Sequence, residues 1–253
     1  GAMSKTLHTA NGTLCGLRSA RLAALGFTAA EDILAGDRGL LGAMTPDNHP
    51  EALTRALSWE NCALLTNSLK PYACCRHTHA ADYCAQLLRG EPEHITRIVD
   101  HTYQVAVNTV DNPEPSTPYG YKFSGQYCTA AMLVYGHLGE SAFTPEATSD
   151  PRVRRLMDKI TLVCDPELEA SYQADRNRWA HRLEVTLEDG RELTRQVEYP
   201  YGDFNNPFTW AYEHEKFHTL ADGVLGPDRV AALVERLPHL EELDDINRLF
   251  EGL

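Results

Sequence analysis

The chain has 253 residues, of which 43% are hydrophobic and 23% are charged, enough apolar material for one large packed domain or two small ones. Its formal net charge of −13 at pH 7 disfavours nucleic acid and anionic membrane as partners. The seven cysteines include no Cys-x-x-Cys pair and no apolar run is long enough to span a bilayer, so we expect a soluble, cytoplasmic protein with reduced thiols.

The N-terminal part of the chain is predicted to be helical. Apolar residues recur with a rough helical period over residues 5–34. Within that span Thr28 and Glu31 have the spacing of a capping box, which begins a second short helix. Turns rich in Gly, Pro and Asp fill residues 36–50, and residues 51–66 are predicted to be mainly helical.

The middle of the chain mixes helical and strand patterns. Residues 79–89 form an amphipathic helical pattern, whereas the apolar alternation over residues 93–107 predicts one long or bent strand. Residues 124–135 and 151–159 are predicted to be helices.

Three further strands are predicted at residues 160–164, 180–188 and 191–199, and residues 208–253 are helical in pieces. The sequence Glu188-Asp189-Gly190 is a strong turn signal between the last two strands. We therefore predict an α+β fold in which helical segments at both ends bracket a central region with a small antiparallel sheet.

One short stretch is unusually dense in chemically active side chains. Lys70-Pro71-Tyr72-Ala73-Cys74-Cys75-Arg76-His77-Thr78-His79, the 70–79 loop, contains a lysine, an arginine, two thiols and two histidines. Arginine and lysine bind carboxylates, and histidine exchanges protons near neutral pH. The loop therefore predicts a site for an anionic substrate that gains or loses protons.

Several segments, in consistent order, resemble the MmgE/PrpD family. They are residues 4–8, the Gly-Phe-Thr to Asp-Ile-Leu segment at 26–34, the 70–79 loop, the Phe-Ser to Met-Leu segment at 123–133, and the segments at 150–153 and 202–207. That family contains 2-methylcitrate dehydratases, cis-aconitate decarboxylases and related cofactor-free lyases and epimerases. The resemblance implies a helical domain, an α+β lid domain and an active site between them.

The resemblance also implies a division of the chain. Residues 1–66 would be the end of the helical domain, residues 67–200 the α+β lid domain, and residues 201–253 the helices that return to the helical domain. Family members are nearly twice as long, and their N-terminal half carries an Asp/Thr/His group of the active site. We therefore interpret the chain as a fragment, a degenerate paralogue or one subunit of a split enzyme.

Five residues are candidates for catalysis. The resemblance implies that Lys5, Lys70 and Tyr127 match active-site residues of the family. His77 and His79 are candidate general acids or bases because of their ordinary titration range. The simpler alternatives are two solvated lysines, a tyrosine of the core, and a histidine that caps or packs at a helix start.

Five other residues are candidates for substrate binding: Arg76, Lys122, Cys75, Gln126 and His8. An arginine can hold a carboxylate with two hydrogen bonds. In decarboxylase-like members a histidine occupies the position of Cys75, so the resemblance favours a dehydratase over a decarboxylase here. Most free cysteines are simply small buried hydrophobic residues.

We expect no metal and no cofactor. The sequence His214-Glu215-Lys216-Phe217-His218 matches the zinc-peptidase signature, but Glu235 and Glu241 downstream do not have a recognisable third-ligand context. The two histidines of the 70–79 loop also have no clear third ligand nearby, and the resemblance implies chemistry without a metal.

These observations favour a cofactor-free lyase acting on a small polycarboxylate or hydroxy acid, with dehydratase ranked first, epimerase or isomerase second and decarboxylase third. A non-catalytic half that binds a partner chain is the alternative from another class, and a zinc peptidase is the least favoured. We expect a small carboxylate substrate, and either a homodimer or a heteromer with a chain that carries the N-terminal helical half.

Overall fold

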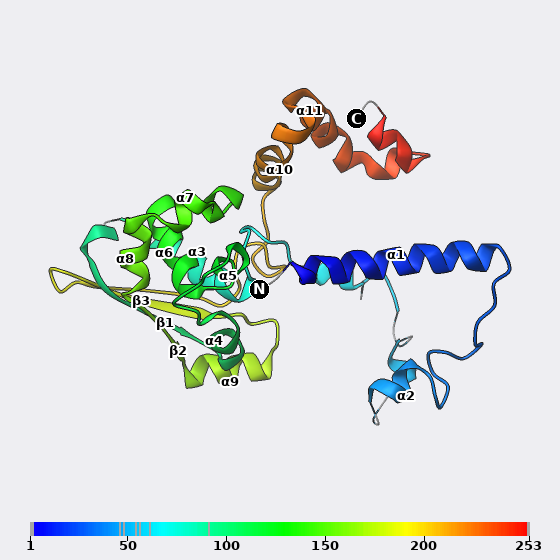
Figure 1. Ribbon diagram of the computed structural model, residues 1–253, viewed down its shortest axis with the longest axis horizontal. Helices are drawn as coiled ribbons and strands as arrows, with labels where there is room; N and C mark the ends of the chain where they lie inside the picture. The colour runs from blue at the N-terminus through cyan, green and yellow to red at the C-terminus, as the bar shows by residue number, and fades with distance from the viewer. Residues whose placement is uncertain are drawn as a thin grey trace. The chain divides into compact units, whose positions relative to one another are not determined.

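The computed structural model describes residues 3–45, 47, 49–53, 55, 57–60, 62–90 and 92–251. The chain divides into two compact units, Gly1–Asn67 and Ser68–Leu253 (Figure 1). No helix in these described ranges is both long and apolar enough to cross a membrane.

The first unit is built on one long helix. Helix α1 (Ser4–Ala24) buries no residue, and a short helix α2 (Leu40–Met44) follows it. Helix α1 ends at Ala24, and Gly26, with a φ of +87°, closes its last turn. The second short helix predicted to begin at Thr28 was wrong, because residues 28–34 contain turns and no helix. The mainly helical prediction for residues 51–66 was wrong, since two short 3₁₀ turns are the helical structure described there, at Pro50–Leu53 and Ala63–Thr66.

The second unit contains a four-stranded sheet in the order β2-β1-β3-β4. The strands are β1 (Ile95–Thr102), β2 (Ile160–Cys164), β3 (His181–Leu187) and β4 (Glu192–Val197). Strand β1 pairs parallel with β2 and antiparallel with β3, and β3 pairs antiparallel with β4. The α+β class is thus confirmed, with a sheet that is mostly rather than purely antiparallel. The β3–β4 hairpin is also confirmed, with Gly190 at a φ of +84° in its turn.

Helices cover both faces of the sheet. Figure 1 shows α3, α6 and α8 on one side and α9 on the other. The helices of this region are α3 (His79–Leu87), α4 (Gln104–Val110), α5 (Pro118–Tyr121), α6 (Gly125–Tyr135), α7 (Pro145–Thr148), α8 (Pro151–Met157) and α9 (Pro166–Ala174). The predictions at 79–89, 124–135 and 151–159 are confirmed to within two residues at either end.

Two local predictions in this region need correction. The single strand over 93–107 is wrong, because β1 ends at Thr102 and α4 then places Ala106 and Val110, four residues apart, on one buried face. Helix α9 was missed, although its start has a clear signal. The Asp165 carboxylate accepts hydrogen bonds from the first-turn amides, and Pro166 occupies the first helical position.

The core of this unit lies between α3, α6 and the sheet. Small fully buried side chains, among them Ala81 and Ala85 on α3 and Ala130 and Ala131 on α6, let the two helices approach closely. Ser124 is the N-cap of α6, and its hydroxyl accepts a hydrogen bond from the Tyr127 amide. This packing supports the base of the 70–79 loop, which leads directly into α3.

The C-terminal region is a helical pair, α10 (Trp210–Leu225) and α11 (Pro227–Arg236), followed by two 3₁₀ segments, Leu237–Glu242 and Ile246–Phe250. The break between the two helices falls at Gly226, whose φ is +86°. Tyr212 on α10 donates a hydrogen bond to the Pro71 carbonyl at 3.3 Å. This bond connects the helical pair to the 70–79 loop.

Candidate functional site

The 70–79 loop is held in place mainly through its backbone. The Ala73 amide donates to the Leu138 carbonyl, and the Cys75 amide donates to the Lys122 carbonyl, both at 2.8 Å. Lys70 is exposed, and its ammonium donates to the Cys74 carbonyl at 2.9 Å. These hydrogen bonds hold the backbone of the loop in one conformation, and a catalytic site needs its charged side chains to be positioned in this way.

Arg76 forms an ion pair across the chain with Asp203, with Nη2 and Oδ2 separated by 2.6 Å. The Arg76 side chain is 15% exposed and that of Asp203 only 2%. Asp203 also accepts hydrogen bonds from the Ser68 hydroxyl and the Asn205 amide. Burial lowers the pKa of Arg76, and the charge of Asp203 opposes that shift. Within the described part of the chain, Nη1 of Arg76 is buried without a hydrogen-bond partner.

His77 is oriented by two aromatic residues. Its Nδ1 lies 2.7 Å from the Tyr103 hydroxyl, and its ring stacks on Trp179 with the centroids 4.5 Å apart. The Arg76 guanidinium lies over the same indole at 5.2 Å. Trp179 thus contacts both a candidate acid/base group and a candidate carboxylate ligand.

His79 is the most unusual residue of the loop. It is fully buried at the first position of α3, and neither ring nitrogen has a hydrogen-bond partner among the described residues. Burial lowers its pKa to about 3, and the charges of Lys70 and Arg76 act in the same direction. The Cys74 carbonyl opposes this shift. His79 is therefore a neutral imidazole at pH 7. Burying a polar group without partners lowers stability, and such groups are found at functional sites.

Three of the predicted residues form hydrogen bonds or ion pairs with other residues of the chain. The fully buried Tyr127 donates its hydroxyl to the Ala142 carbonyl, and burial raises its pKa. Gln126 donates from Nε2 to Asp111 at 2.6 Å, and Lys122 forms an ion pair with Glu140 at 2.8 Å.

The remaining predicted residues fall into two places. Cys75 lies in the 70–79 loop and is 7% exposed within the core. Lys5 and His8 lie on the exposed helix α1 of the first unit. Of the predicted residues, Lys70, Arg76 and His77 are the ones whose charges act on buried His79. Cys75 lies in the same stretch of chain.

Tyr103, Trp179 and Asp203 are not among the site residues predicted from the sequence. Asp203 lies in the Gly-Asp-Phe-Asn-Asn-Pro segment that carries part of the family resemblance, so that segment was a usable signal. Tyr103 and Trp179 carry no comparable signal, because their roles arise only from contacts over long separations in sequence.

A zinc-peptidase centre has no counterpart in the described ranges. His218 on α10 pairs with Asp222 at 3.0 Å. In the part of the chain that the structure describes, one group of at least three possible ligands converges, and it consists of Cys74, Asp82 and Cys128 rather than His214 and His218.

Comparison with known proteins agrees with the features of the loop. A model of the MmgE/PrpD C-terminal domain matches residues 72–239. A cis-aconitate decarboxylase-like protein of Aspergillus oryzae is 27% identical over 81% of this chain and 44% of its own length. A mitochondrial 2-methylcitrate dehydratase of Yarrowia lipolytica is 30% identical over 50% of this chain and 26% of its own. The cis-aconitate decarboxylase of Aspergillus terreus is 28% identical over 74% and 40%.

The chain spans less than half the length of these curated relatives. The matched domain nevertheless includes Arg76, His77 and His79, the whole sheet and the turn that carries Asp203. Since the match covers well over half of the chain, the protein belongs to the MmgE/PrpD family.

Proposed function

We propose that this chain is the lid-bearing part of a cofactor-free lyase, a dehydratase of a small polycarboxylate or hydroxy acid. The observation that carries the proposal is His79, a buried neutral imidazole in the same loop as Lys70 and Arg76. Its ring nitrogens make no hydrogen bond of ordinary geometry within the described ranges. Two cations beside a neutral base are suited to removing a proton next to a carboxylate.

The cations would hold the carboxylates of the substrate. Arg76 already uses Nη2 on Asp203, and its buried Nη1 is available for a carboxylate oxygen. Lys70 is exposed at the edge of the same loop. Both charges would stabilise the negative charge that builds up on the substrate when its proton is removed.

Two histidines would move the protons. Binding of an anion would offset the charges of Lys70 and Arg76 and raise the pKa of His79, making it a stronger base. His79 would take the proton from carbon, and His77, held by Tyr103 and Trp179, would protonate the hydroxyl group as the carbon–oxygen bond breaks. The products are an alkene and water. Lys5 keeps the catalytic role that the resemblance implies. Tyr127 does not, because its hydroxyl is donated to the Ala142 carbonyl inside the core, and we assign it to positioning α6 instead.

Other reactions of the family remain alternatives. An epimerase or isomerase would return the proton to carbon on the opposite face. A decarboxylase ranks third, because Cys75 is a buried thiol where decarboxylase-like members have a histidine.

We also propose that residues 1–66 and 201–253 belong to a helical domain and that residues 67–200 form the lid. Helix α1 exposes Leu7, Leu14 and Leu17 and buries none of its residues, so we expect it to pack on a helical half from the same chain, a second copy or another subunit. Free cysteines favour a reducing compartment, and we propose the cytoplasm. A non-catalytic half that binds a partner chain is the second candidate function. It is supported by the same exposed leucines of α1.

The test is to produce the chain together with the N-terminal half of an MmgE/PrpD relative, isolate the assembled pair, and assay 2-methylcitrate and cis-aconitate. We expect turnover by the pair, and a loss of about 10²-fold or more in kcat for His79→Gln. Glu188→Gln, which removes the charge of an exposed pair with His94 at the β3–β4 turn, is the matched control and should stay active. An assembled pair that converts neither compound, nor any related hydroxy acid, would support the non-catalytic alternative.

A further inference from the structure

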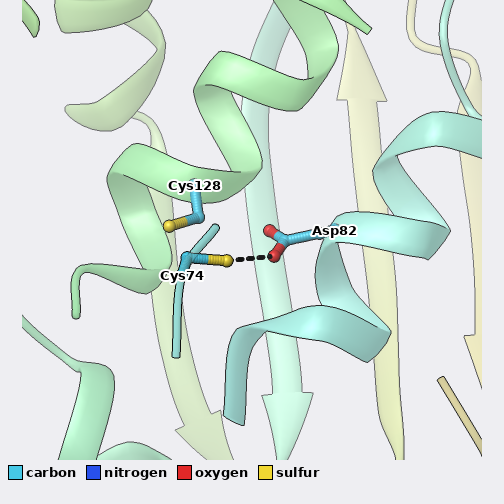
Figure 2. Close-up of side chains that lie close together, drawn as sticks. All are labelled: Cys74, Asp82 and Cys128. Atoms are coloured by element: carbon cyan, nitrogen blue, oxygen red, sulfur yellow. Dashed lines mark hydrogen bonds between the residues drawn. The ribbon is translucent and has the colours of Figure 1, made fainter. Parts of the chain in front are cut away.

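Three potential metal ligands converge in the core of the second unit. They are Cys74 of the 70–79 loop, Asp82 of α3 and Cys128 of α6 (Figure 2). Their sulfur and carboxylate oxygen atoms all lie within 4.8 Å of one another. Cys74 is 6% exposed and the other two are fully buried.

The buried carboxylate of Asp82 forms no ion pair with any residue that the structure describes. Its Oδ2 accepts hydrogen bonds from the Thr78 hydroxyl at 2.6 Å and the Cys74 thiol at 3.5 Å. Its Oδ1 has no partner in the described ranges. An ionised carboxylate without a counter-charge is strongly unfavourable in such a place. The site therefore needs either a proton or a cation.

Protons are one way to neutralise the cluster. Asp82 and the two thiols are uncharged when they hold their protons. Protonation still leaves one carboxyl oxygen without a hydrogen bond. A bound cation would replace the protons and give that oxygen a ligand bond.

We propose that Cys74, Asp82 and Cys128 bind a structural divalent cation of the zinc class. Two thiolates are soft ligands and, with a carboxylate, select zinc over magnesium or calcium. Thr78 lies 3.2 Å from the Cys74 sulfur and 2.6 Å from Asp82, so its hydroxyl is the polar group placed to complete a tetrahedral set. Binding releases the two thiol protons and the carboxyl proton. The net charge of −1 that remains is spread over three metal–ligand bonds instead of resting on one carboxylate.

The proposed ion would link three separate parts of the fold. Cys74, Asp82 and Cys128 come from the loop, α3 and α6, so the ion would fasten the loop that carries Arg76 and His77 to the core. Because the ligands are buried, uptake is expected during folding rather than after it. The ion takes no part in the proton transfers proposed for His79.

The primary experiment measures metal content. The full chain is refolded with zinc, dialysed against a weak chelator, and analysed by mass spectrometry of the elements. We expect about one zinc per chain, and less than about a tenth of that for Cys74→Ser/Cys128→Ser and for Asp82→Asn. Cys164→Ser removes an exposed thiol outside the cluster and should retain the metal. Equal zinc in all variants, or none in the wild type, overturns the proposal.

A second measurement uses only the wild-type chain, so it holds even if the variants fail to fold. Cobalt replaces zinc in refolding, and thiolate ligation produces a charge-transfer absorption in the near ultraviolet. The Tm should also rise with the concentration of zinc present during refolding. Absence of the thiolate band overturns the proposal and leaves Asp82 as a neutral acid. Neither measurement involves substrate. Failure of the metal proposal can therefore be told apart from failure of the proposed enzyme activity.

Discussion

Arg76 and Asp203 are 127 residues apart in the chain and form an ion pair at 2.6 Å. Asp203 has almost no contact with solvent, so its charge is balanced by Arg76 and by hydrogen bonds from Ser68 and Asn205. The pair fixes one amino group of the guanidinium and leaves the other for a ligand. It connects the 70–79 loop to the turn near residue 203.

Removing the charge of Asp203 should destabilise the protein. Asp203→Asn leaves Arg76 without its counter-charge, and breaking such a pair costs about 2–3 kcal/mol when one partner is partly exposed. Urea unfolding of the wild type and of the Asp203→Asn variant measures this difference in the free energy of unfolding. Glu140→Gln breaks the exposed Lys122 pair instead and should cost less than about 1 kcal/mol. Equal effects of the two changes would contradict the role given to Asp203.

His79 should make stability depend on pH. Its pKa falls from 6.5 in the unfolded chain to about 3 in the fold, so between these values the unfolded state binds the extra proton. Stability from this group is complete above pH 6.5 and is lost as pH falls, by about 4 kcal/mol on reaching pH 3.

Replacing His79 with leucine should remove much of that dependence. His79→Leu also eliminates two buried nitrogens without partners, so stability at pH 7 should be unchanged or higher while activity of the assembled pair is lost. Unfolding in urea at a series of pH values tests both points. His8→Gln, which changes an exposed histidine of α1, is the matched control. If the free energy of unfolding of the variant changes with pH as steeply as that of the wild type, another group is responsible.

Tyr103 should act through His77. Tyr103→Phe fills the same buried space but removes the hydroxyl that lies 2.7 Å from the histidine Nδ1. We expect a loss of about 1 kcal/mol in stability. In the assembled pair kcat should fall more than KM changes, with a displaced pH profile, because the imidazole loses its orientation. A change in stability alone, with an unaltered pH profile, would mean that the contact is only structural.

Tyr127 should be more important for folding than for proton transfer. Its hydroxyl is donated to the Ala142 carbonyl inside the core. Tyr127→Phe therefore leaves a buried carbonyl without its donor and should lower stability by about 1–2 kcal/mol. Thermal unfolding measures that loss. In the assembled pair of chains the variant should keep a kcat within about threefold of the wild-type value. A kcat drop of 10²-fold without destabilisation would restore a direct catalytic role.

Local patterns allowed much of the fold to be predicted. The β3–β4 hairpin follows from alternating apolar residues and a glycine turn, and helix α6 follows from an apolar run after Ser124. The error over residues 93–107 arose because Val105 and Val107 continue the apolar alternation of a strand. The Tyr103 ring, fully buried against Tyr172, marks instead where the chain turns into α4.

The sequence by itself determined the composition of the site: a short loop with two cations and two histidines, in a chain whose ordered segments resemble one family. Only the tertiary structure decided the state of those groups. Asp203 neutralises Arg76, Tyr103 and Trp179 orient His77, and burial keeps His79 uncharged. The physical reason is that the charge state and orientation of a side chain depend on its neighbours and its distance from water, and these neighbours come from distant parts of the chain.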